Sequence, residues 1–489
     1  MPDSSGQAAL AAVLLSVAVV AAALVAKLAP EPYMDEPFHV PQTQAYCAGR
    51  WREWDPKITT FPGLYVFGAA LGHAVAASQR LLPAAMLPAL PLCSTTVLRS
   101  ASLLFAAACL PLFHHAARQL DVSRSQRQLN LMAAACFLFP LHFFFSVLYY
   151  TDVPSLFFTL AAYLAAQQQR HYLAAALGAA AVAVRQTNAV WVAFTLGAAV
   201  LARCQPAAGD HGDGGSSSRA NSSGRGGGRR PPNSSRQRAG WLADLRRLLR
   251  QVWLRRGQLA GELGPLAAVV TAFAAFVVVN GGVVVGDKAH HVPVRHLAQP
   301  LYFLLYCTAW LAPVFWSPQA LMAAAREIAA TARRQPATSA AIAAAAAAAA
   351  SGAVARGTLA HPFLLADNRH YTFYIWRRLI DRSPWSRYAL IPAYLYAGWA
   401  VQRRLAHRDP LWLLGLAGAT CLVLVPAHLL EFRYFSTPFY LVFLHMRTPS
   451  PRALAVVVAS FAAVNAATLY VYLYRPFAWA DGSVARFMW

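Results

Sequence analysis

Long apolar stretches recur along the whole chain and alternate with short polar segments. About thirteen apolar stretches lie at 8–29, 97–118, 128–146, 153–168, 171–186, 188–203, 263–286, 300–316, 338–358, 386–401, 411–430, 434–447 and 453–474. Several approach the roughly 20 residues that a helix needs to cross a bilayer. Because a chain in lipid must satisfy its own backbone hydrogen bonds, the pattern predicts an all-α polytopic membrane protein.

Charge patterning gives these spans an orientation. If the first span starts in the cytoplasm, the basic segments collect on one side, which is then cytoplasmic. They are 118–128, 167–171, 204–257, 326–334, 402–408 and 445–452. The other side collects short clusters of mixed polar chemistry. They are 33–39, 149–152, 185–188, 286–291, 361–378 and 431–434. We therefore expect any chemistry to occur on the non-cytoplasmic face.

Composition agrees with a membrane protein. The 489 residues are 58% hydrophobic and only 12% charged, whereas soluble domains carry roughly 25% charged residues. The net charge of +23 is explained by cytoplasmic Lys and Arg, so we predict no nucleic-acid partner.

The chain divides into two membrane modules around a polar insert. We predict an N-terminal module at 1–203 with a first luminal loop at 30–96, and a C-terminal module at 258–489 with a luminal loop at 359–385. Between them, 204–257 forms a basic cytoplasmic insert. Its Gly/Ser/Arg-rich part, 205–240, is predicted to be disordered. Residues 241–256 space apolar side chains as in an amphipathic helix on an anionic membrane surface.

The apolar stretch 62–92 allows more than one structure. Pro83, Pro88 and Pro91 interrupt it, and proline breaks a helix interior. It could form a re-entrant or interfacial hairpin, or a pair of further spans. Nearby, Cys47 and Cys93 could form a disulfide if both face an oxidising lumen.

The segment 33–65 carries the first candidate chemistry. Asp35 and Glu36 are adjacent carboxylates at a membrane boundary, where charge is costly unless solvated or functional. Either could act as a general base, or both could simply be solvated loop acids, with Asp35 capping a short helix. His39, Trp51 and Trp54 follow, and the flat Trp faces suit sugars, although interfacial Trp is also common.

Two later clusters add cations to this face. Residues 361–382 bring together Asp367, Asn368, Arg369, His370 and Tyr371, with Arg377 and Arg378 beyond them. Arg binds phosphate through a planar fork of donors, while lipid head groups are an alternative partner for Arg377 and Arg378. Lys288 in "GDKAHH" and Arg433 in "EFRYF" are weaker candidates.

A luminal base facing a luminal phosphate clamp suits group transfer from a lipid-phosphate donor. The acceptor hydroxyl loses its proton to a carboxylate, and cations stabilise the leaving phosphate. No cofactor is required for this chemistry. The Asp35–Glu36 pair could in principle hold a metal ion, but we favour catalysis without metal.

Seven motifs resemble one family. They are "YMDEPFHVPQTQAYC", "WDPKITTFPGLY", "RQTNAVW", "GDKAHH", "HPFLLADNRHYTFYIWRR", "EFRYF" and the terminal "RFMW". They resemble the eukaryotic dolichyl-phosphate-glucose alpha-1,2-glucosyltransferases, in order from residue 33 to Trp489. The resemblance implies a multispan enzyme of the GT-C type in the endoplasmic reticulum membrane, with its active site facing the lumen. The implied substrates are dolichyl phosphate glucose and the diglucosylated high-mannose dolichyl-diphosphate oligosaccharide used in protein N-glycosylation.

The resemblance also implies residue roles. The donor is beta-linked and the product alpha-linked, so an inverting transfer needs one base, assigned to Asp35 with Glu36 second. Arg369 and His370 are implied at the donor phosphate, with Lys288 and Arg433 weaker. His39, Trp51, Trp54, Asp367, Asn368 and Tyr371 are left as candidate sugar or acceptor contacts. Two alternatives remain: a membrane transporter, and a sister mannosyl- or glucosyltransferase that uses the same lipid-phosphate chemistry.

Overall fold

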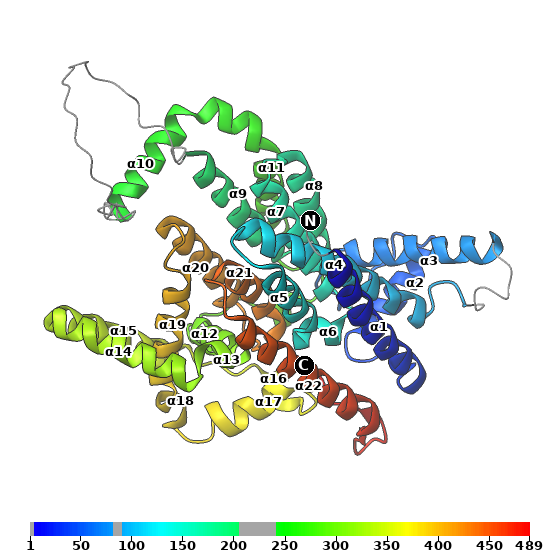
Figure 1. The fold of residues 1–489 in the computed structure, drawn as a ribbon. Helices are drawn as coiled ribbons and strands as arrows, with labels where there is room; N and C mark the ends of the chain where they lie inside the picture. The colour runs from blue at the N-terminus through cyan, green and yellow to red at the C-terminus, as the bar shows by residue number, and fades with distance from the viewer. Residues whose placement is uncertain (1–3, 82–89, 205–240) are drawn as a thin grey trace.

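In a computed structural model, residues 4–81, 90–204 and 241–489 can be described. This part of the chain is almost wholly helical (Figure 1). Its one sheet is a short antiparallel pair, β1 (Phe477–Ala478) with β2 (Val484–Ala485). The predicted all-α class is confirmed. The predicted disordered segment 205–240 lies outside the described residues.

Five of the described helices are long and apolar enough to cross a membrane. They are α1 (Ser4–Leu28), α4 (Thr95–Leu120), α11 (Arg256–Asn280), α15 (Pro336–Gly357) and α22 (Pro451–Tyr474). The shortest, α15, has 22 residues and is about 33 Å long, which matches the roughly 30 Å hydrocarbon core. Only 11% of the apolar window of α11 and of α15 is buried inside the protein. Apolar surface this exposed indicates contact with lipid.

The other predicted spans coincide with shorter helices or with pairs of helices. Those of the N-terminal half are α5 (Gln126–Leu138), α6 (Pro140–Phe145), α7 (Asp152–Gln167), α8 (His171–Val184) and α9 (Asn188–Cys204). Those of the C-terminal half are α12 (Gln299–Trp310), α13 (Ala312–Phe315), α18 (Ser386–Ala389), α19 (Ile391–Leu405), α20 (Pro410–Leu424) and α21 (Ser436–His445). Pro140 explains the break within 128–146, because proline ends one helix and suits the first turn of the next.

Aromatic packing joins the two halves in the core. The ring of Phe139, at the α5–α6 junction, stacks on Phe439 of α21 with centroids 4.2 Å apart. Phe461 of α22 and Trp310 of α12 contact the same ring edge-on. Such pairs stabilise beyond the area they bury, so residues 300 positions apart form one continuous core.

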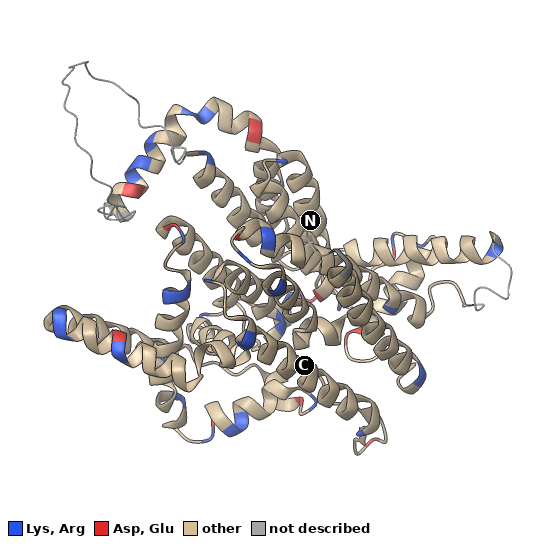
Figure 2. Cartoon of the chain, in the orientation of Figure 1, with Lys and Arg blue, Asp and Glu red and all other residues tan. Residues whose placement is uncertain are grey.

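Two amphipathic helices lie outside this core. The helix expected at 241–256 is present as α10 (Trp241–Leu254), with Arg246, Arg247 and Arg250 on it. The basic segment 326–334 belongs to α14 (Pro318–Arg334), which pairs with α15 in a helical hairpin. Figure 2 shows Lys and Arg along α10 and at the outer end of this hairpin.

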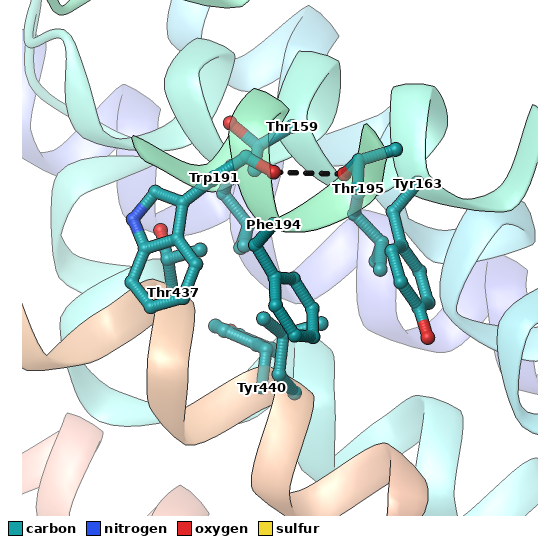
Figure 3. A pocket seen from close by; sticks show the side chains of 10 residues that line it. Thr159, Tyr163, Trp191, Phe194, Thr195, Thr437 and Tyr440 are labelled. Carbon is teal, nitrogen blue, oxygen red and sulfur yellow. Dashed lines mark hydrogen bonds between the residues drawn. The ribbon is translucent and has the colours of Figure 1, made fainter. Parts of the chain in front are cut away.

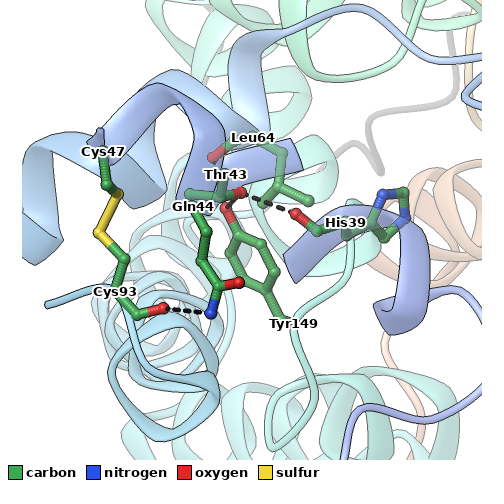
Figure 4. Close-up of a disulfide and its surroundings, with 7 residues drawn as sticks. All are labelled: His39, Thr43, Gln44, Cys47, Leu64, Cys93 and Tyr149. Carbon is green, nitrogen blue, oxygen red and sulfur yellow. Dashed lines mark hydrogen bonds between the residues drawn. A yellow bond between two sulfur atoms is a disulfide. The ribbon is translucent and has the colours of Figure 1, made fainter. Parts of the chain in front are cut away.

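Two helices follow α1 in the predicted first luminal loop, α2 (Glu36–Cys47) and α3 (Gly63–Leu81), and they pack together. A disulfide joins Cys47 at the end of α2 to Cys93, the pairing that the sequence left open (Figure 4). The Gln44 amide also donates to the Cys93 carbonyl oxygen at 3.2 Å. These links attach the far end of the loop to α2, the helix that begins directly after Asp35.

Short helical pieces make up the later polar clusters. They are the 3₁₀ turn η1 (Ala289–His291), α16 (Pro362–Ala366), α17 (Tyr371–Ile375), the π-helical turn η2 (Trp376–Ile380) and the 3₁₀ turn η3 (Phe432–Phe435). α17 and η2 are continuous and lie beside the end of the chain, where His370 forms a parallel bridge with Met488. This places 361–382 next to the C-terminal segment.

Candidate active site

The chain turns sharply before α2, and this turn aims Asp35. Met34 adopts a left-handed backbone conformation, with φ 61°. Asp35 occupies the N-cap position of α2, but its carboxylate makes no capping hydrogen bond. Its backbone N–H donates to the Tyr150 hydroxyl at 3.0 Å. The carboxylate is therefore free to point at another element.

That element is η3. The Oδ2 atom of Asp35 lies 2.9 Å from Nη1 of Arg433, and 39% of the Asp35 side chain is exposed. Burial works to raise the pKa of the Asp35 carboxyl, but Arg433, with smaller contributions from His39 and His370, outweighs it and lowers the pKa. Asp35 is thus ionised at neutral pH and partly open to a substrate, as a general base must be.

Further carboxylates lie close to Arg433. Glu431 accepts from its Nε at 3.2 Å and Nη2 at 3.0 Å, and Asp152, at the start of α7, lies 3.7 Å from Nη1. Asp152 is paired in turn with Arg185, at 3.0 Å. Asp152 and Arg185 belong to two of the polar clusters that the sequence placed on the same face, 149–152 and 185–188. We define Asp35, Asp152, Arg185, Glu431 and Arg433 as the carboxylate–arginine cluster.

Glu36 has a different environment from its neighbour. Its side chain is 0% exposed, and both oxygens accept from Arg99 of α4, at 2.6 and 2.8 Å. The backbone N–H groups of Tyr149 and Tyr33 donate to the same carboxylate, at 2.7 and 3.0 Å. Glu36 therefore joins α2, α4 and the segment before α7, and its oxygens are already occupied.

The other first-loop candidates differ in accessibility. His39, one turn after Asp35, is buried, and its Nδ1 lies 2.9 Å from the Tyr65 hydroxyl. Burial lowers the pKa of His39 more than Asp35 raises it, so the ring is neutral at pH 7. Trp54 packs on Tyr65, at 5.7 Å between ring centroids. Trp51 is 55% exposed and rests on Tyr46, so it offers a ring face to solvent.

The loop before α17 approaches the same region. Asp367 forms a bidentate pair with Arg369, at 2.7 and 2.8 Å. The Arg369 guanidinium also lies over the rings of Trp479, at 4.6 Å, and Tyr33, at 5.9 Å. His370 is one of the groups that lower the pKa of Asp35. Of the predicted residues, Asp35, His39, His370 and Arg433 are therefore close enough to interact electrostatically.

The end of the chain holds this loop in place, which sequence reasoning missed. His370 Nδ1 lies 3.0 Å from the main-chain oxygen of Trp489, and Tyr371 packs on the Trp489 ring. The Tyr33 hydroxyl donates to the Arg486 carbonyl at 2.8 Å and accepts from its N–H. The quoted terminal motif "RFMW" was the only signal for this arrangement.

Two of the predicted site residues, Lys288 and Asn368, take less part in the site. The Nζ atom of Lys288 donates to the Asn280 carbonyl at the end of α11, at 2.6 Å, and Lys288 is exposed. Asn368 is half-buried beside Asp367. The structure shows no contact of either with the carboxylate–arginine cluster among the described residues. Within that same part of the chain, no three His, Cys, Asp or Glu side chains are grouped as a metal site requires.

A small cavity lies between α7, α9 and α21 (Figure 3). Its volume is about 10 Å³, room for about one water molecule. It is lined by Leu, Thr and aromatic side chains, and the Thr195 hydroxyl beside it donates to the Trp191 carbonyl at 2.8 Å. Without a carboxylate or cation in its lining, this cavity is separate from the candidate site.

Comparison with known proteins decides the family. The family model described as "DIE2/ALG10 family" matches residues 29–444. This chain belongs to the DIE2/ALG10 family. The matched region contains Asp35, Arg369, His370 and Arg433 and ends before Arg486. No solved structure matches the chain.

Three curated relatives of this DIE2/ALG10 chain share one name, Dol-P-Glc:Glc(2)Man(9)GlcNAc(2)-PP-Dol alpha-1,2-glucosyltransferase. The Arabidopsis thaliana protein is 35% identical over 99% of this chain and 100% of its own length. The Rattus norvegicus protein is 35% identical over 94% of this chain and 93% of its own. A Homo sapiens protein is 32% identical over the same shares. The similarity is thus continuous over both predicted membrane modules.

Proposed function

We propose that this DIE2/ALG10 protein transfers glucose from dolichyl phosphate glucose to Glc(2)Man(9)GlcNAc(2)-diphosphodolichol and forms an alpha-1,2 linkage. Nearly full-length similarity to relatives of that name supports the activity. The observation that carries the chemistry is the ionised, partly exposed Asp35 held against Arg433. A transporter, the alternative from another class, is not favoured by these relatives.

Asp35 is the proposed base. The terminal glucose hydroxyl of the acceptor attacks the anomeric carbon of the donor, on the face opposite the phosphate. The bond between that carbon and the phosphate oxygen breaks, and its electron pair leaves on dolichyl phosphate. The hydroxyl proton moves to the Asp35 carboxylate. One displacement inverts the beta-linked donor to an alpha-linked product, with no covalent enzyme intermediate.

Arg433 is best placed to orient Asp35. Its guanidinium faces three carboxylates, those of Asp35, Glu431 and Asp152, so it has little charge to spare for a phosphate. Glu36 is proposed to support the site from within a buried ion pair. Asp35 is thus proposed as the base and Glu36 as a structural support, because the two adjacent acids have different arginine partners.

Arg369 and His370 are proposed to receive the donor phosphate. Asp367 accepts from Nε and Nη2 of Arg369, and the Tyr33 hydroxyl is a further partner of the guanidinium. A guanidinium has five N–H groups, so donors remain for a phosphate. If His370 donates to Trp489 through Nδ1, its Nε2 can donate to a phosphate only when the ring is protonated. Lys288 remains a weaker candidate, since it is bound to Asn280.

The sugars of the acceptor are proposed to contact the first luminal loop and the segment before α17. Trp51 offers the exposed ring face, and Asn368 and Tyr371 adjoin Arg369 in the chain. His39, Trp54 and Asp367 are committed to other side chains and are proposed to shape the site from behind. The proposed reaction uses no cofactor or metal ion.

The proposed topology has about thirteen spans in two modules, 1–203 and 258–489, joined by the cytoplasmic segment 204–257. It is supported by the five long apolar helices and by the basic residues on α10 and α14. The proposed location is the endoplasmic reticulum membrane with the site in the lumen. The Cys47–Cys93 disulfide beside α2 supports that face, because disulfides persist in oxidising compartments.

Reconstituted transfer tests the function. The purified chain in lipid nanodiscs is given dolichyl phosphate glucose and the diglucosylated acceptor, with and without chelator, and the product linkage is determined. We expect one alpha-1,2 glucose per acceptor, with no effect of chelator and no transfer from dolichyl phosphate mannose. Transfer from the mannose donor instead would favour a sister transferase, and loss of transfer with chelator would refute the metal-free mechanism.

A further inference from the structure

Three arginines surround a cavity that the proposed reaction does not use. The cavity has a volume of about 400 Å³ and is lined by Phe373 and Tyr374 of α17, by Arg377 and Arg378 of η2, and by Arg382 just beyond it. Its lining residues, apart from Arg382, belong to the motif "HPFLLADNRHYTFYIWRR". For Arg377 and Arg378 the sequence left two partners open, a phosphate and lipid head groups.

The cavity is rich in positive charge without acidic partners. Among the described residues, none of the three lining arginines forms an ion pair. The Arg378 guanidinium lies over the Tyr374 ring, 5.4 Å from its centroid. The nearby Arg387, by contrast, is neutralised by Asp381 at 2.8 Å. Like charges gathered around one space repel each other unless an anion enters it.

Buried neighbours hold the backbone that carries Arg377 and Arg378. Trp376 and Ile380, which flank Arg377 and Arg378 in η2, are each only 4% exposed. The turn is closed by a hydrogen bond from the Asp381 N–H to the Trp376 carbonyl, at 2.8 Å. π-helical turns are rare and occur often at functional sites. The guanidinium groups are thus presented by a fixed turn.

The position of the cavity limits which phosphate could bind there. The helix begins after His370, which is near enough to Asp35 to help lower the pKa of that carboxyl. Arg378 follows eight positions later, about two helical turns away. The donor phosphate is bonded to the reacting carbon and must lie within a sugar ring of the base. The diphosphate of the acceptor is separated from its reacting glucose by the whole glycan. The position of the cavity therefore suits the diphosphate of the acceptor better than the phosphate of the donor.

We propose that Arg377, Arg378 and Arg382 bind the diphosphate group of the lipid-linked acceptor. Guanidinium forks match phosphate oxygens in geometry as well as charge. Phe373 and Tyr374 add aromatic surface of the kind that sits between head groups and hydrocarbon. The inference rests on the proposed function for its ligand, and it assigns a second contact region that fixes the anchored end of the acceptor.

The test compares two acceptors in nanodiscs of neutral phosphatidylcholine. One is the natural dolichyl-diphosphate acceptor, and the other carries the same glycan on a neutral alkyl chain. In the triple variant Arg377→Gln/Arg378→Gln/Arg382→Gln, we expect the KM for the diphosphate acceptor to rise about tenfold or more. The KM for the neutral acceptor and for the donor, and kcat, should be unchanged. The matched control, Arg387→Gln, should behave as wild type.

Several outcomes would overturn the inference. An equal rise in KM for both acceptors would do so, as would a rise for the donor alone. If the variant differs from wild type only in discs that contain phosphatidylserine, the cavity holds a phospholipid head group instead. If the triple variant fails to fold, the single variant Arg382→Gln is measured in the same way.

A binding measurement separates this inference from the proposed function. Thermal unfolding of the purified chain is followed with and without citronellyl diphosphate as the probe. Wild type and Arg387→Gln should be stabilised by the probe and the triple variant should not. If wild type transfers no glucose but still shows this difference, the function fails and the diphosphate site stands. Equal stabilisation of all three proteins would overturn the site whatever the transfer assay shows.

Discussion

The carboxylate of Asp35 and the guanidinium of Arg433 lie 2.9 Å apart although 398 positions separate them in the chain. Asp35 stands between α1 and α2, and Arg433 lies in η3 between α20 and α21. The contact therefore joins the N-terminal and C-terminal halves of the chain at the proposed base. It also lets one cation control both the direction and the protonation of that base.

The first prediction concerns pH. Replacing Arg433 by Gln removes the nearest cation, so burial then dominates and the pKa of Asp35 rises. A base is lost as pH falls through its pKa. The acidic limb of the transfer rate should therefore move to higher pH in Arg433→Gln, measured from about pH 4 to 8.

The control for this profile is Arg403→Gln, which breaks the half-exposed pair with Glu327 far from Asp35 in the chain. Its acidic limb should coincide with that of wild type. Identical limbs in Arg433→Gln and wild type would show that Arg433 does not set the ionisation of the base.

The second prediction separates Glu36 from Asp35 by stability. Glu36→Gln leaves the buried Arg99 charge without its partner, which typically destabilises by about 3–5 kcal/mol. Asp35→Asn should change stability far less, because Asp35 is partly exposed. Thermal unfolding of the purified variants measures the difference.

A double-mutant cycle checks the cause. If the pair itself matters, Glu36→Gln and Arg99→Gln together should destabilise by clearly less than the sum of the two single variants. Additive losses would mean that Glu36 and Arg99 act independently, contrary to the bidentate contact.

The third prediction tests the disulfide. PEG-maleimide should label Cys47 and Cys93 in the denatured protein only after reduction. Cys47→Ser should lower stability by about 2–4 kcal/mol, because the bond constrains the unfolded chain across 46 positions. Cys421→Ser, at an exposed free cysteine, is the control and should have little effect. Labelling of Cys47 before reduction would contradict the pairing and remove the support that it gives to a luminal location of this loop.

The fourth prediction concerns the donor phosphate. Arg369→Lys keeps the charge but loses the planar fork, so the KM for dolichyl phosphate glucose should rise about tenfold. The KM for the acceptor should stay the same. Arg334→Lys on α14, at an exposed arginine, is the matched control. A rise confined to the acceptor would place Arg369 among the sugar contacts instead.

Apolar length predicted the helical membrane class well, because lipid leaves a chain few choices of structure. Helix ends were less predictable. The stretch 128–146 is divided at Pro140, and 300–316 is divided between α12 and α13. These breaks depend on local backbone geometry that hydropathy does not report.

The roles of Asp35 and Glu36 could not be separated from sequence. The two acids are adjacent, and each role depends on a distant arginine: Arg99, 63 positions from Glu36, and Arg433, 398 from Asp35. Motif resemblance marked Arg369 and His370, but only the fold showed that Arg486 and Trp489 hold that loop against Tyr33.

The most direct test compares glucose transfer by wild type, Asp35→Asn and Glu36→Gln, each normalised to the amount of folded protein. If Asp35 is the base, Asp35→Asn should fold like wild type and lose transfer by about 10²–10⁴-fold. Glu36→Gln should yield less folded protein, but each folded molecule should retain transfer. Near-normal transfer by Asp35→Asn, or a stable Glu36→Gln enzyme without activity, would contradict the assignment of Asp35 as the base.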